Sequence, residues 1–502
     1  MRILRKTSLL QCLFIAGLML SAGCSKDDEN ILPLETATTT EHNGQLKAGS
    51  TAVMIQTFTL FTEKWPDIQS KASAWGSAGF TMAWFPPVSR AADTYGYLPT
   101  QWYDYNNWRG SSSQLASCIS AIRNAGMTPI ADIVLNHRNG NATAGADFVN
   151  PAFANNAAAV VSNDECNCGT GGADQGTGLA VGRDLNHNNA SVVSLSKAYV
   201  ASQMALGFGG GRYDMVLGYS AANASQYRTS GFNVGEYWVD SRTEINNWAN
   251  AAGMNAFDFT TYNRLRTAVA GNYSVLAGVP GLIGLNPGRA VTFSGNHDTP
   301  SSGLLGLVYI LTHPGIPCVA VDEWYSYSNQ IKTLIGIRKA QGIGQTSSVS
   351  VQTATSSVYA AIIDGKVAMK IGPGSWSPPS GTWTLATSGT NYAVWTGSSS
   401  GGGTGITITL RMMKDVGQGY ALFFTGNQSV LTSWGTGVQG TWNTGNYWTK
   451  TVTLPAGTTS VEWKVRKGPY GGTGSTWESG SNHVITNPAN GATYTATFNG
   501  GF

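Results

Sequence analysis

The chain has 502 residues, a formal net charge of +3 and only 11% charged residues. A chain of this length is expected to form two or three domains, because single cores rarely grow beyond about 250–300 residues. Part of the positive excess lies in the first six residues, so no basic stripe remains to neutralise a row of phosphates, and nucleic acid is excluded as a partner.

The first 24 residues have the pattern of a lipoprotein signal peptide. Basic residues precede an apolar run from Leu9 to Leu20, which is too short to span a membrane comfortably. The small residues before Cys24 resemble a lipobox, so we expect lipidation of Cys24; an ordinary signal peptide is the alternative. The acidic segment 25–29 resembles the tag of lipoproteins at the bacterial outer surface. It predicts an outer-membrane lipoprotein that faces the cell surface and is anchored only by its lipid, with a polar linker over residues 25–50; a periplasmic location is the alternative.

The other cysteines predict no metal centre. Cys118 and Cys318 lie in apolar patterns and are expected to be buried single thiols. Cys166 and Cys168 are separated by one residue, which we take as too close for a relaxed mutual disulfide. No cysteine spacing is typical of zinc.

From residue 53 to about 325, short apolar runs alternate with helical patterns. Helices are expected over segments such as 112–125, 191–206 and 242–251. The expected strands are 53–59, 80–85, 128–135, 210–217, 232–237, 255–260, 290–295 and 318–322. Eight strand–helix units predict an α/β fold in which eight parallel strands close a (β/α)8 TIM barrel.

The domain organisation follows from these patterns. The barrel is expected over residues 51–340, with a small inserted domain at 137–190, since a connection this long is usually functional. A small antiparallel β domain follows over 341–397, with a hairpin turn at Asp364-Gly365. A Gly/Ser linker at 398–405 leads to a C-terminal β-sandwich over 406–502.

Polar side chains follow several of the barrel strands. Function in such barrels lies at the carboxyl ends of the strands, so these residues should meet at one mouth. They are Asn136, His137 and Arg138; Arg212 and Asp214; Glu236; and Asn296, His297 and Asp298. Each could be structural alone, but three carboxylates from three strands suit glycoside cleavage, which needs one carboxylate to attack and one to protonate. Arg212, two residues before Asp214 on a strand, can hold Asp214 ionised.

Four strings give these residues a family context. ADIVLNHR (131–138), GGRYDMVLGY (210–219), FNVGEYW (232–238) and FSGNHDTP (293–300) resemble, in order, the signature regions of the α-amylase family, glycoside hydrolase family 13. YGYLP (95–99) and YILTHPGIP (309–317) fit as well. The likeness is greatest to plant α-amylases and bacterial maltotetraose-forming amylases, and covers roughly residues 53–395.

The resemblance implies a role for each residue. Asp214 would be the nucleophile, Glu236 the general acid and then base, and Asp298 the stabiliser of the distorted sugar ring. His137 and His297 would bind that sugar, with Tyr97 as the platform beneath it and Arg212 positioning Asp214. Double displacement would then retain the anomeric configuration, with the two reacting carboxyls roughly 5–5.5 Å apart.

The family also implies Ca²⁺. Asn136, Asp184 and the carbonyl of Gly218 match its ligands, and Asp164 and Asp174 are further candidates. Hard oxygen ligands suit calcium, although an ordinary loop Asn and Asp remain the alternative. Two positions depart from the family pattern: Leu217 replaces a basic residue on the leaving-group side, which leaves product length open, and Gly295 replaces a common acidic residue.

The tail resembles a family 20 starch-binding module through TVTLPAG (451–457), SVEWKVRK (460–467) and STWESGSNHVIT (475–486). Trp434, Trp477, Lys464 and Asn482 match its main sugar site. A core tryptophan is the alternative for Trp434, whereas Trp477 lies among Ser, Gly and Asn in a turn-like stretch. Together these resemblances predict a monomeric, secreted, retaining α-amylase that binds and hydrolyses starch. A transglycosylase and a catalytically inactive surface receptor are the alternatives.

Overall fold

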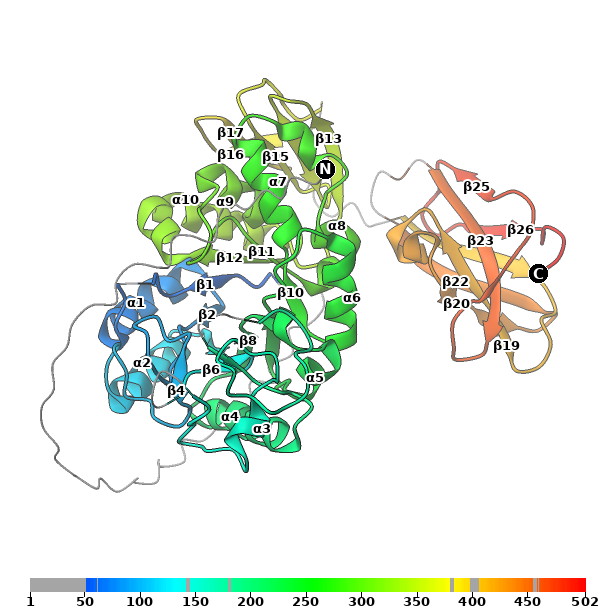
Figure 1. Cartoon of the computed structure of the whole chain (residues 1–502). Coiled ribbons are helices and arrows are strands. Elements are labelled where there is room, and N and C mark those ends of the chain that lie inside the picture. Colours follow the sequence, from blue (N-terminus) through cyan, green and yellow to red (C-terminus); the bar gives the residue numbers. More distant parts are fainter. Residues whose placement is uncertain are drawn as a thin grey trace, which may run out of the picture. The chain divides into compact units, whose positions relative to one another are not determined.

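The computed structural model (Figure 1) describes residues 51–60, 62–140, 145–178, 182–379, 383–397, 406–454, 458 and 460–502. The expected signal peptide, the lipidation at Cys24, and the linkers at 25–50 and 398–405 lie outside these residues. Among the helices that the structure describes, none is both long and apolar enough to cross a membrane.

Eight parallel strands close a barrel in the order β1-β12-β11-β10-β9-β8-β5-β2. They are β1 (Met54–Gln56), β2 (Met82–Trp84), β5 (Thr128–Ile133), β8 (Gly210–Tyr213), β9 (Phe232–Gly235), β10 (Asn255–Phe257), β11 (Ala290–Phe293) and β12 (Ile316–Ala320). The predicted barrel is therefore confirmed. The last strand was placed two residues late, because Val321 already begins the following helix.

Helices alternate with these strands and surround the barrel (Figure 1). They are α1 (Trp65–Ala78), α2 (Ser112–Asn124), α3 (Asn156–Ala159), α4 (Ala190–Ala205), α5 (Ala221–Gln226), α6 (Arg242–Ala252), α7 (Phe259–Val269), α8 (Leu282–Leu285), α9 (Gly303–Thr312) and α10 (Val321–Ala340). Their ends follow local chemistry. Ser111 caps α2 by accepting a hydrogen bond from the Gln114 amide, and Gly253, at φ 66°, ends α6 in the left-handed conformation that glycine adopts most readily.

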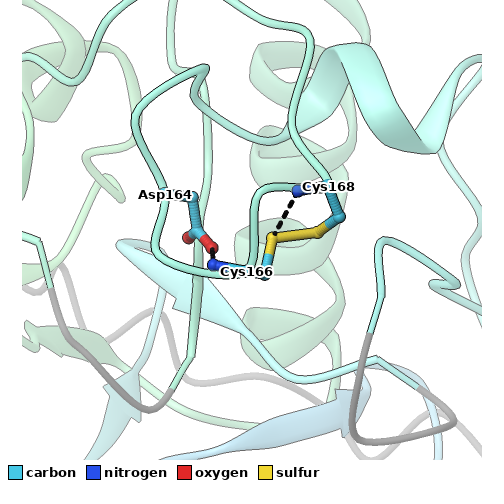
Figure 2. Close-up of side chains that lie close together, drawn as sticks. All are labelled: Asp164, Cys166 and Cys168. Atoms are coloured by element: carbon cyan, nitrogen blue, oxygen red, sulfur yellow. Dashed lines mark hydrogen bonds between the residues drawn. A yellow bond between two sulfur atoms is a disulfide. The ribbon is translucent and has the colours of Figure 1, made fainter.

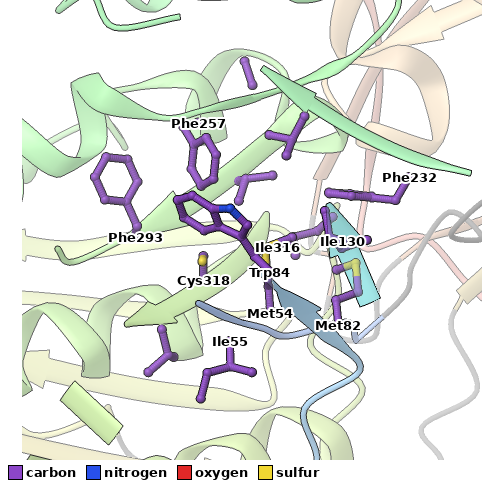
Figure 3. Close-up of a cluster of buried hydrophobic side chains, with 14 of the residues drawn as sticks. Met54, Ile55, Met82, Trp84, Ile130, Phe232, Phe257, Phe293, Ile316 and Cys318 are labelled. Carbon is purple, nitrogen blue, oxygen red and sulfur yellow. The ribbon is translucent and has the colours of Figure 1, made fainter. Parts of the chain in front are cut away.

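Large apolar side chains fill the barrel (Figure 3). Trp84 of β2 lies between residues of neighbouring and opposite strands, with its ring 5.4 Å from that of Phe257. Ile55, Ile130 and Ile316 are fully buried in the same hydrophobic cluster. Nearly all residues of the short strands are buried, which explains why the sequence shows them as brief apolar runs. Cys118 and Cys318 are buried free thiols, as predicted.

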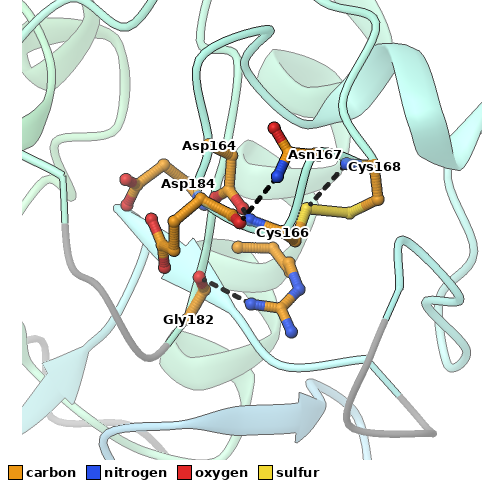
Figure 4. Close-up of a disulfide and its surroundings, with 8 residues drawn as sticks. Asp164, Cys166, Asn167, Cys168, Gly182 and Asp184 are labelled. Atoms are coloured by element: carbon orange, nitrogen blue, oxygen red, sulfur yellow. Dashed lines mark hydrogen bonds between the residues drawn. A yellow bond between two sulfur atoms is a disulfide. The ribbon is translucent and has the colours of Figure 1, made fainter.

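The long connection after β5 is held by few regular elements. β6 (His137–Arg138) pairs antiparallel with β7 (Arg183–Asp184), so the two ends of the connection meet beside the barrel. Within it, Cys166 and Cys168 form a disulfide with a Cα–Cα distance of 5.2 Å (Figure 4). The expectation that these cysteines are too close to pair is wrong. Asn167 takes the left-handed conformation, φ 54°, and this turn brings the flanking residues to an ordinary disulfide spacing.

A five-stranded antiparallel sheet follows the barrel in the order β13-β14-β15-β17-β16. Its strands are β13 (Val349–Ala354), β14 (Tyr359–Ile363), β15 (Val367–Ile371), β16 (Trp383–Gly389) and β17 (Tyr392–Gly397). Asp364 and Gly365, both with positive φ, form the predicted hairpin turn between β14 and β15. The sheet packs on the barrel domain, where Tyr359 hydrogen-bonds the buried His313 at 2.9 Å.

The C-terminal part forms a separate core between two sheets, in the orders β21-β22-β18-β26 and β20-β19-β23-β24, with β25 also on β23. The strands are β18 (Ile406–Met413), β19 (Tyr420–Gly426), β20 (Val438–Gln439), β21 (Thr441–Asn443), β22 (Tyr447–Leu454), β23 (Ser460–Pro469), β24 (Thr476–Trp477), β25 (His483–Thr486) and β26 (Thr493–Ala496). This agrees with the predicted β-sandwich.

Two short strands, β3 (Arg90–Ala91) and β4 (Pro99–Gln101), pair in the connection after β2 of the barrel.

Candidate active site

Three carboxylates lie where the barrel strands end. Asp214 directly follows β8, Glu236 directly follows β9, and Asp298 lies in the connection after β11. Because all eight strands are parallel, these residues belong to the same end of the barrel. Asp214 and Glu236 are largely buried, whereas the side chain of Asp298 is 36% exposed.

Arg212 joins the buried carboxylates. Its Nη1 lies 2.7 Å from Asp214 Oδ1 and 2.9 Å from Asp132 Oδ1, and its Nη2 lies 2.5 Å from Glu236 Oε1. The guanidinium also lies over the ring of Trp84, with 4.8 Å to the centroid. One buried cation therefore faces three carboxyl groups from three neighbouring strands. The predicted pairing of Arg212 with Asp214 is present, and the other two pairings add to it.

Asp132 is a site residue that the sequence analysis missed. It is fully buried on β5, and its Oδ2 accepts hydrogen bonds from Trp84 Nε1 at 3.0 Å and from the Tyr97 hydroxyl at 2.8 Å. The available signal was a carboxylate in the middle of an apolar run. In the parallel register of β5 and β8, Asp132 pairs with Arg212, which gives that carboxylate its cation.

Aromatic and imidazole rings surround the carboxylates. The ring of Tyr97 stacks on that of His297, with centroids 5.2 Å apart and planes 7° from parallel. His137 Nε2 lies 2.6 Å from the carbonyl oxygen of Tyr97, and His297 Nε2 lies 3.0 Å from Asp298 Oδ2. The structure thus brings together Tyr97, His137, Arg212 and His297, all of which the sequence singled out.

The environment separates the proton affinities of the carboxyl groups. Burial, reinforced by the charges of Asp214 and Asp298, raises the pKa of Glu236 well above its ordinary value, although Arg212 opposes the shift. Burial would also raise the pKa of Asp298, but His297 and Arg212 outweigh it and lower that pKa. One group suited to hold a proton therefore lies beside one suited to stay ionised, an arrangement typical of acid–base catalysis.

The connection that carries His297 and Asp298 is anchored at both ends by Glu323. The hydroxyls of Ser294 and Ser301 donate to Glu323 Oε1, and the Ala320 amide donates to Oε2 at 3.1 Å. Burial raises the pKa of Glu323 to about 7. These hydrogen bonds fix both ends of the connection between β11 and α9, which carries His297 and Asp298.

The candidate metal ligands also meet. Asn136 Nδ2 donates to Asp184 Oδ1 at 3.0 Å, and a Cβ on Gly218 would lie 1.6 Å from Asn136 Oδ1, so only glycine allows this approach. The Asp184 amide donates to Asp164 Oδ2 at 2.8 Å. The carboxylates of Asp164, Glu165 and Asp184 offer oxygens within 4.8 Å of one another. Asp164 lies beside the disulfide (Figure 2), and Asp184 lies close to it (Figure 4).

Asp174 and Glu165 are two further acidic residues close to these ligands. Asp174 lies near this group, since Asp174 Oδ2 and Asp184 Oδ2 both approach Gly178. Glu165 was not singled out from the sequence, because one acidic residue in a polar loop carries no distinct signal.

The predicted sugar site of the C-terminal domain is partly assembled. The rings of Trp434 and Trp477 lie 6.4 Å apart at 43°, and Trp477 is 40% exposed. Lys464 Nζ donates to the carbonyls of Glu478 and Gly480, and Asn482 Nδ2 donates to Glu462 Oε2 at 2.9 Å. The amine and the amide therefore lie along the segment that follows Trp477, but each already has a protein partner.

Comparison with known protein families matches two parts of the chain. Residues 340–396 match the alpha-amylase C-terminal beta-sheet domain, and residues 405–497 match the starch binding domain.

Two curated relatives extend the match to the barrel. Over 396 residues, 68% of this chain and 93% of the relative, the sequence is 36% identical to probable alpha-amylase 2 of Arabidopsis thaliana. Over 504 residues, 85% of this chain and 88% of the relative, it is 28% identical to glucan 1,4-alpha-maltotetraohydrolase of Stutzerimonas stutzeri.

Solved structures show the same architecture. The gamma-CGTase from alkalophilic Bacillus clarkii superposes with a TM-score of 0.55 at 15% identity, over 89% of this chain and 98% of that one. An alpha-amylase from Malbranchea cinnamomea gives 0.52 at 16% identity, over 84% and 97%. At these identities the likeness establishes the fold alone.

Proposed function

Because the chain belongs to the α-amylase family and is a glycoside hydrolase of α-1,4-glucans, we propose that it cleaves starch by double displacement at Asp214 and Glu236. The observation that carries this proposal is the buried Arg212, which contacts both carboxylates, at 2.7 and 2.5 Å. A carboxylate paired with a cation, together with a buried carboxyl group of raised pKa, suits retaining glycoside cleavage.

In the first step, a carboxylate oxygen of Asp214 attacks the anomeric carbon while Glu236 donates its proton to the leaving oxygen. Asp214 Oδ1 is engaged by Arg212, which leaves Oδ2 as the attacking atom. Arg212 pairs with the Asp214 carboxylate, and burial raises the pKa of Glu236, which favours its protonated form. The products are a glucosyl ester on Asp214 and a shortened glucan.

In the second step, the ionised Glu236 takes a proton from water, and the water oxygen attacks the anomeric carbon and releases Asp214. Two inversions retain the α configuration. Asp298, beside His297 at the open side of the site, is placed to hydrogen-bond sugar hydroxyls. Tyr97, His137 and His297 supply the ring surface and donors around the same sugar.

Replacement of Asp214 by Asn tests this assignment. We expect kcat on soluble starch to fall by about 10⁴-fold or more, because the isosteric amide cannot form the ester. Asp240→Asn is the matched control: this carboxylate is 41% exposed and pairs with Arg264 at the surface, so its loss should leave kcat within about twofold. Activity that survived Asp214→Asn would contradict the mechanism. A wild-type chain that bound starch without cleaving it would favour the receptor alternative.

We also propose a structural Ca²⁺ held by the side chains of Asn136 and Asp184 and the carbonyl of Gly218, with Asp164 as a further ligand. The donor set fits, since it consists of hard oxygens that meet where the long connection returns to the barrel. Bound calcium would supply positive charge that holds the two strands of this connection together. It takes no part in the steps above.

For the C-terminal domain, a starch-binding module, we propose that Trp434 and Trp477 present the sugar-binding surface, with Lys464 and Asn482 at its edge. We further propose export of the chain and lipidation of Cys24, which depend on the sequence pattern alone. Incorporation of a palmitate analogue that persisted in Cys24→Ala would contradict the lipid anchor.

A further inference from the structure

The disulfide between Cys166 and Cys168 lies beside Asp164 in the long connection after β5 (Figure 2). We propose that this disulfide is a redox modification site, at which exchange with a small dithiol opens the bond and weakens Ca²⁺ binding nearby. In the exchange the bond between the two Sγ atoms breaks and each sulfur takes up a proton, while the dithiol loses two protons and two electrons and closes to a disulfide. The inference rests on the calcium site proposed above.

The disulfide closes a tight turn around the carboxylate of Asp164. The amide of Cys166 donates to Asp164 Oδ1 at 2.9 Å, and the amide of Asn167 donates to the Asp164 carbonyl at 3.0 Å. The amide of Cys168 donates to Cys166 Sγ at 3.1 Å (Figure 2). Asn167 has φ 54°, a left-handed conformation that residues other than glycine seldom adopt. The bond between the flanking sulfurs therefore stabilises a turn that the backbone alone would disfavour.

The carboxylate of Asp164 connects this turn to the returning end of the long connection. Asp164 is only 3% exposed, and its Oδ2 accepts a hydrogen bond from the Asp184 amide at 2.8 Å. The Asp184 side chain in turn accepts one from Asn136 Nδ2 at 3.0 Å. Asp164 and Asp184 lie together around the disulfide in Figure 4. Hydrogen bonds thus link the turn at Cys166 to the proposed Ca²⁺ ligands, so a change in the turn reaches them.

The disulfide lies near the solvent, where a dissolved dithiol can attack it. Cys166 and Cys168 are both half-buried, and Asn167 between them is exposed. The free thiols of the described residues, Cys118 and Cys318, are buried, and burial raises the pKa of each, that of Cys118 to about 12. Since the thiolate is the form that attacks a disulfide, neither thiol is suited to rearrange the bond. Exchange at this disulfide therefore depends on a dithiol from outside the chain.

Opening the bond gives the turn conformational freedom that Ca²⁺ binding must then remove. In the oxidised chain, the turn holds the Asp164 carboxylate in place before the ion arrives, and a preorganised site binds its ligand more tightly. In the reduced chain, part of the binding free energy is used to order residues 164–168. Linkage requires that bound Ca²⁺ favour the oxidised form by the same factor by which reduction weakens Ca²⁺ binding, and we expect that factor to be about tenfold.

The test measures Ca²⁺ binding to the full chain by calorimetric titration, before and after reduction with dithiothreitol. Reduction should raise the Kd for Ca²⁺ about tenfold. The double variant Cys166→Ser, Cys168→Ser should bind as weakly as the reduced chain and should not respond to dithiothreitol. Asp240→Asn, which changes a surface carboxylate paired with Arg264, is the control and should respond to reduction as the wild type does.

The reciprocal measurement follows opening of the disulfide with and without Ca²⁺. Saturating CaCl2 should raise the ratio of reduced to oxidised dithiothreitol needed for half-reduction by about tenfold. Equal Ca²⁺ affinities of the oxidised and reduced chains would overturn the coupling and leave the calcium site standing. An oxidised chain that takes up no Ca²⁺ would instead contradict the calcium site itself, and the coupling with it.

Discussion

At the scale of single residues, the site is organised by the fully buried Arg212, which faces Asp132, Asp214 and Glu236 at once. Three carboxylates around one cation cannot all be fully compensated, so one of them is favoured to hold a proton. Burial raises the pKa of both Asp132 and Glu236, and it raises that of Glu236 well above its ordinary value, which favours Glu236 as the protonated group. Burial and geometry thus support the proposed division of roles, with Asp214 as nucleophile and Glu236 as acid.

The raised pKa of Glu236 predicts the alkaline side of the pH profile. The first step needs the protonated acid, so kcat/KM should fall as pH rises through this raised pKa and Glu236 ionises. Glu236→Gln should lower kcat/KM by about 10²–10⁴-fold and abolish this alkaline fall. Glu244→Gln, an exposed isosteric change in α6, should keep it. If kcat/KM of Glu236→Gln still fell at alkaline pH as in the wild type, the titrating group would not be Glu236.

The residues missed by sequence reasoning share one cause. Asp132 looked like a polar residue inside an apolar strand, and only the register of β5 with β8 reveals its partner Arg212. The Cys166–Cys168 disulfide depends on a single left-handed residue, Asn167, whose conformation no spacing rule gives. Both depend on backbone geometry that a linear pattern does not contain.

At the scale of elements, alternation of buried strands and helices sufficed to predict the barrel, because each strand is a brief apolar run between helical patterns. The signal of β13 is weaker, since its three apolar residues are all only half-buried. The sequence predicts the positions of the strands better than their ends. β12 begins and ends two residues earlier than expected, because Val321 belongs to the following helix and not to the strand.

The calcium site proposed in the long connection between β5 and α4 predicts that the thermal stability of the chain depends on calcium. Chelation of the full chain should lower its thermal stability, and added CaCl2 should restore it, because a ligand at 100 times its Kd stabilises by about 2.7 kcal/mol. Asp184→Asn should weaken Ca²⁺ binding by at least about tenfold in a calorimetric titration. Asp240→Asn is the control. A chelated chain that takes up no Ca²⁺ would contradict the proposed site.

At the scale of the whole molecule, a catalytic barrel with its antiparallel sheet is joined in one chain to a module with its own core. Such a link raises the local concentration of substrate for the catalytic site, once the module binds a starch surface. Family resemblance predicted this organisation. The structure adds where Trp434 and Trp477 lie, and that Lys464 and Asn482 already have protein partners.

The module makes its own prediction. Trp477→Ala should weaken binding of the full chain to granular starch about tenfold, equivalent to about 1.4 kcal/mol, while kcat on soluble maltooligosaccharides stays unchanged. Trp376→Ala, a partly buried tryptophan beside the five-stranded sheet, is the control and should bind granules as the wild type does. Equal granule binding by Trp477→Ala would remove this residue from the sugar surface.

The anomeric form of the first products tests the central claim most directly. The chain, with Ca²⁺ present, is mixed with soluble starch, and the new reducing ends are followed by proton NMR over the first minutes, before mutarotation equilibrates them. A double displacement through Asp214 and Glu236 predicts that the α-anomer appears first. Initial release of the β-anomer would mean a single displacement by water and would contradict the role of Asp214 as nucleophile.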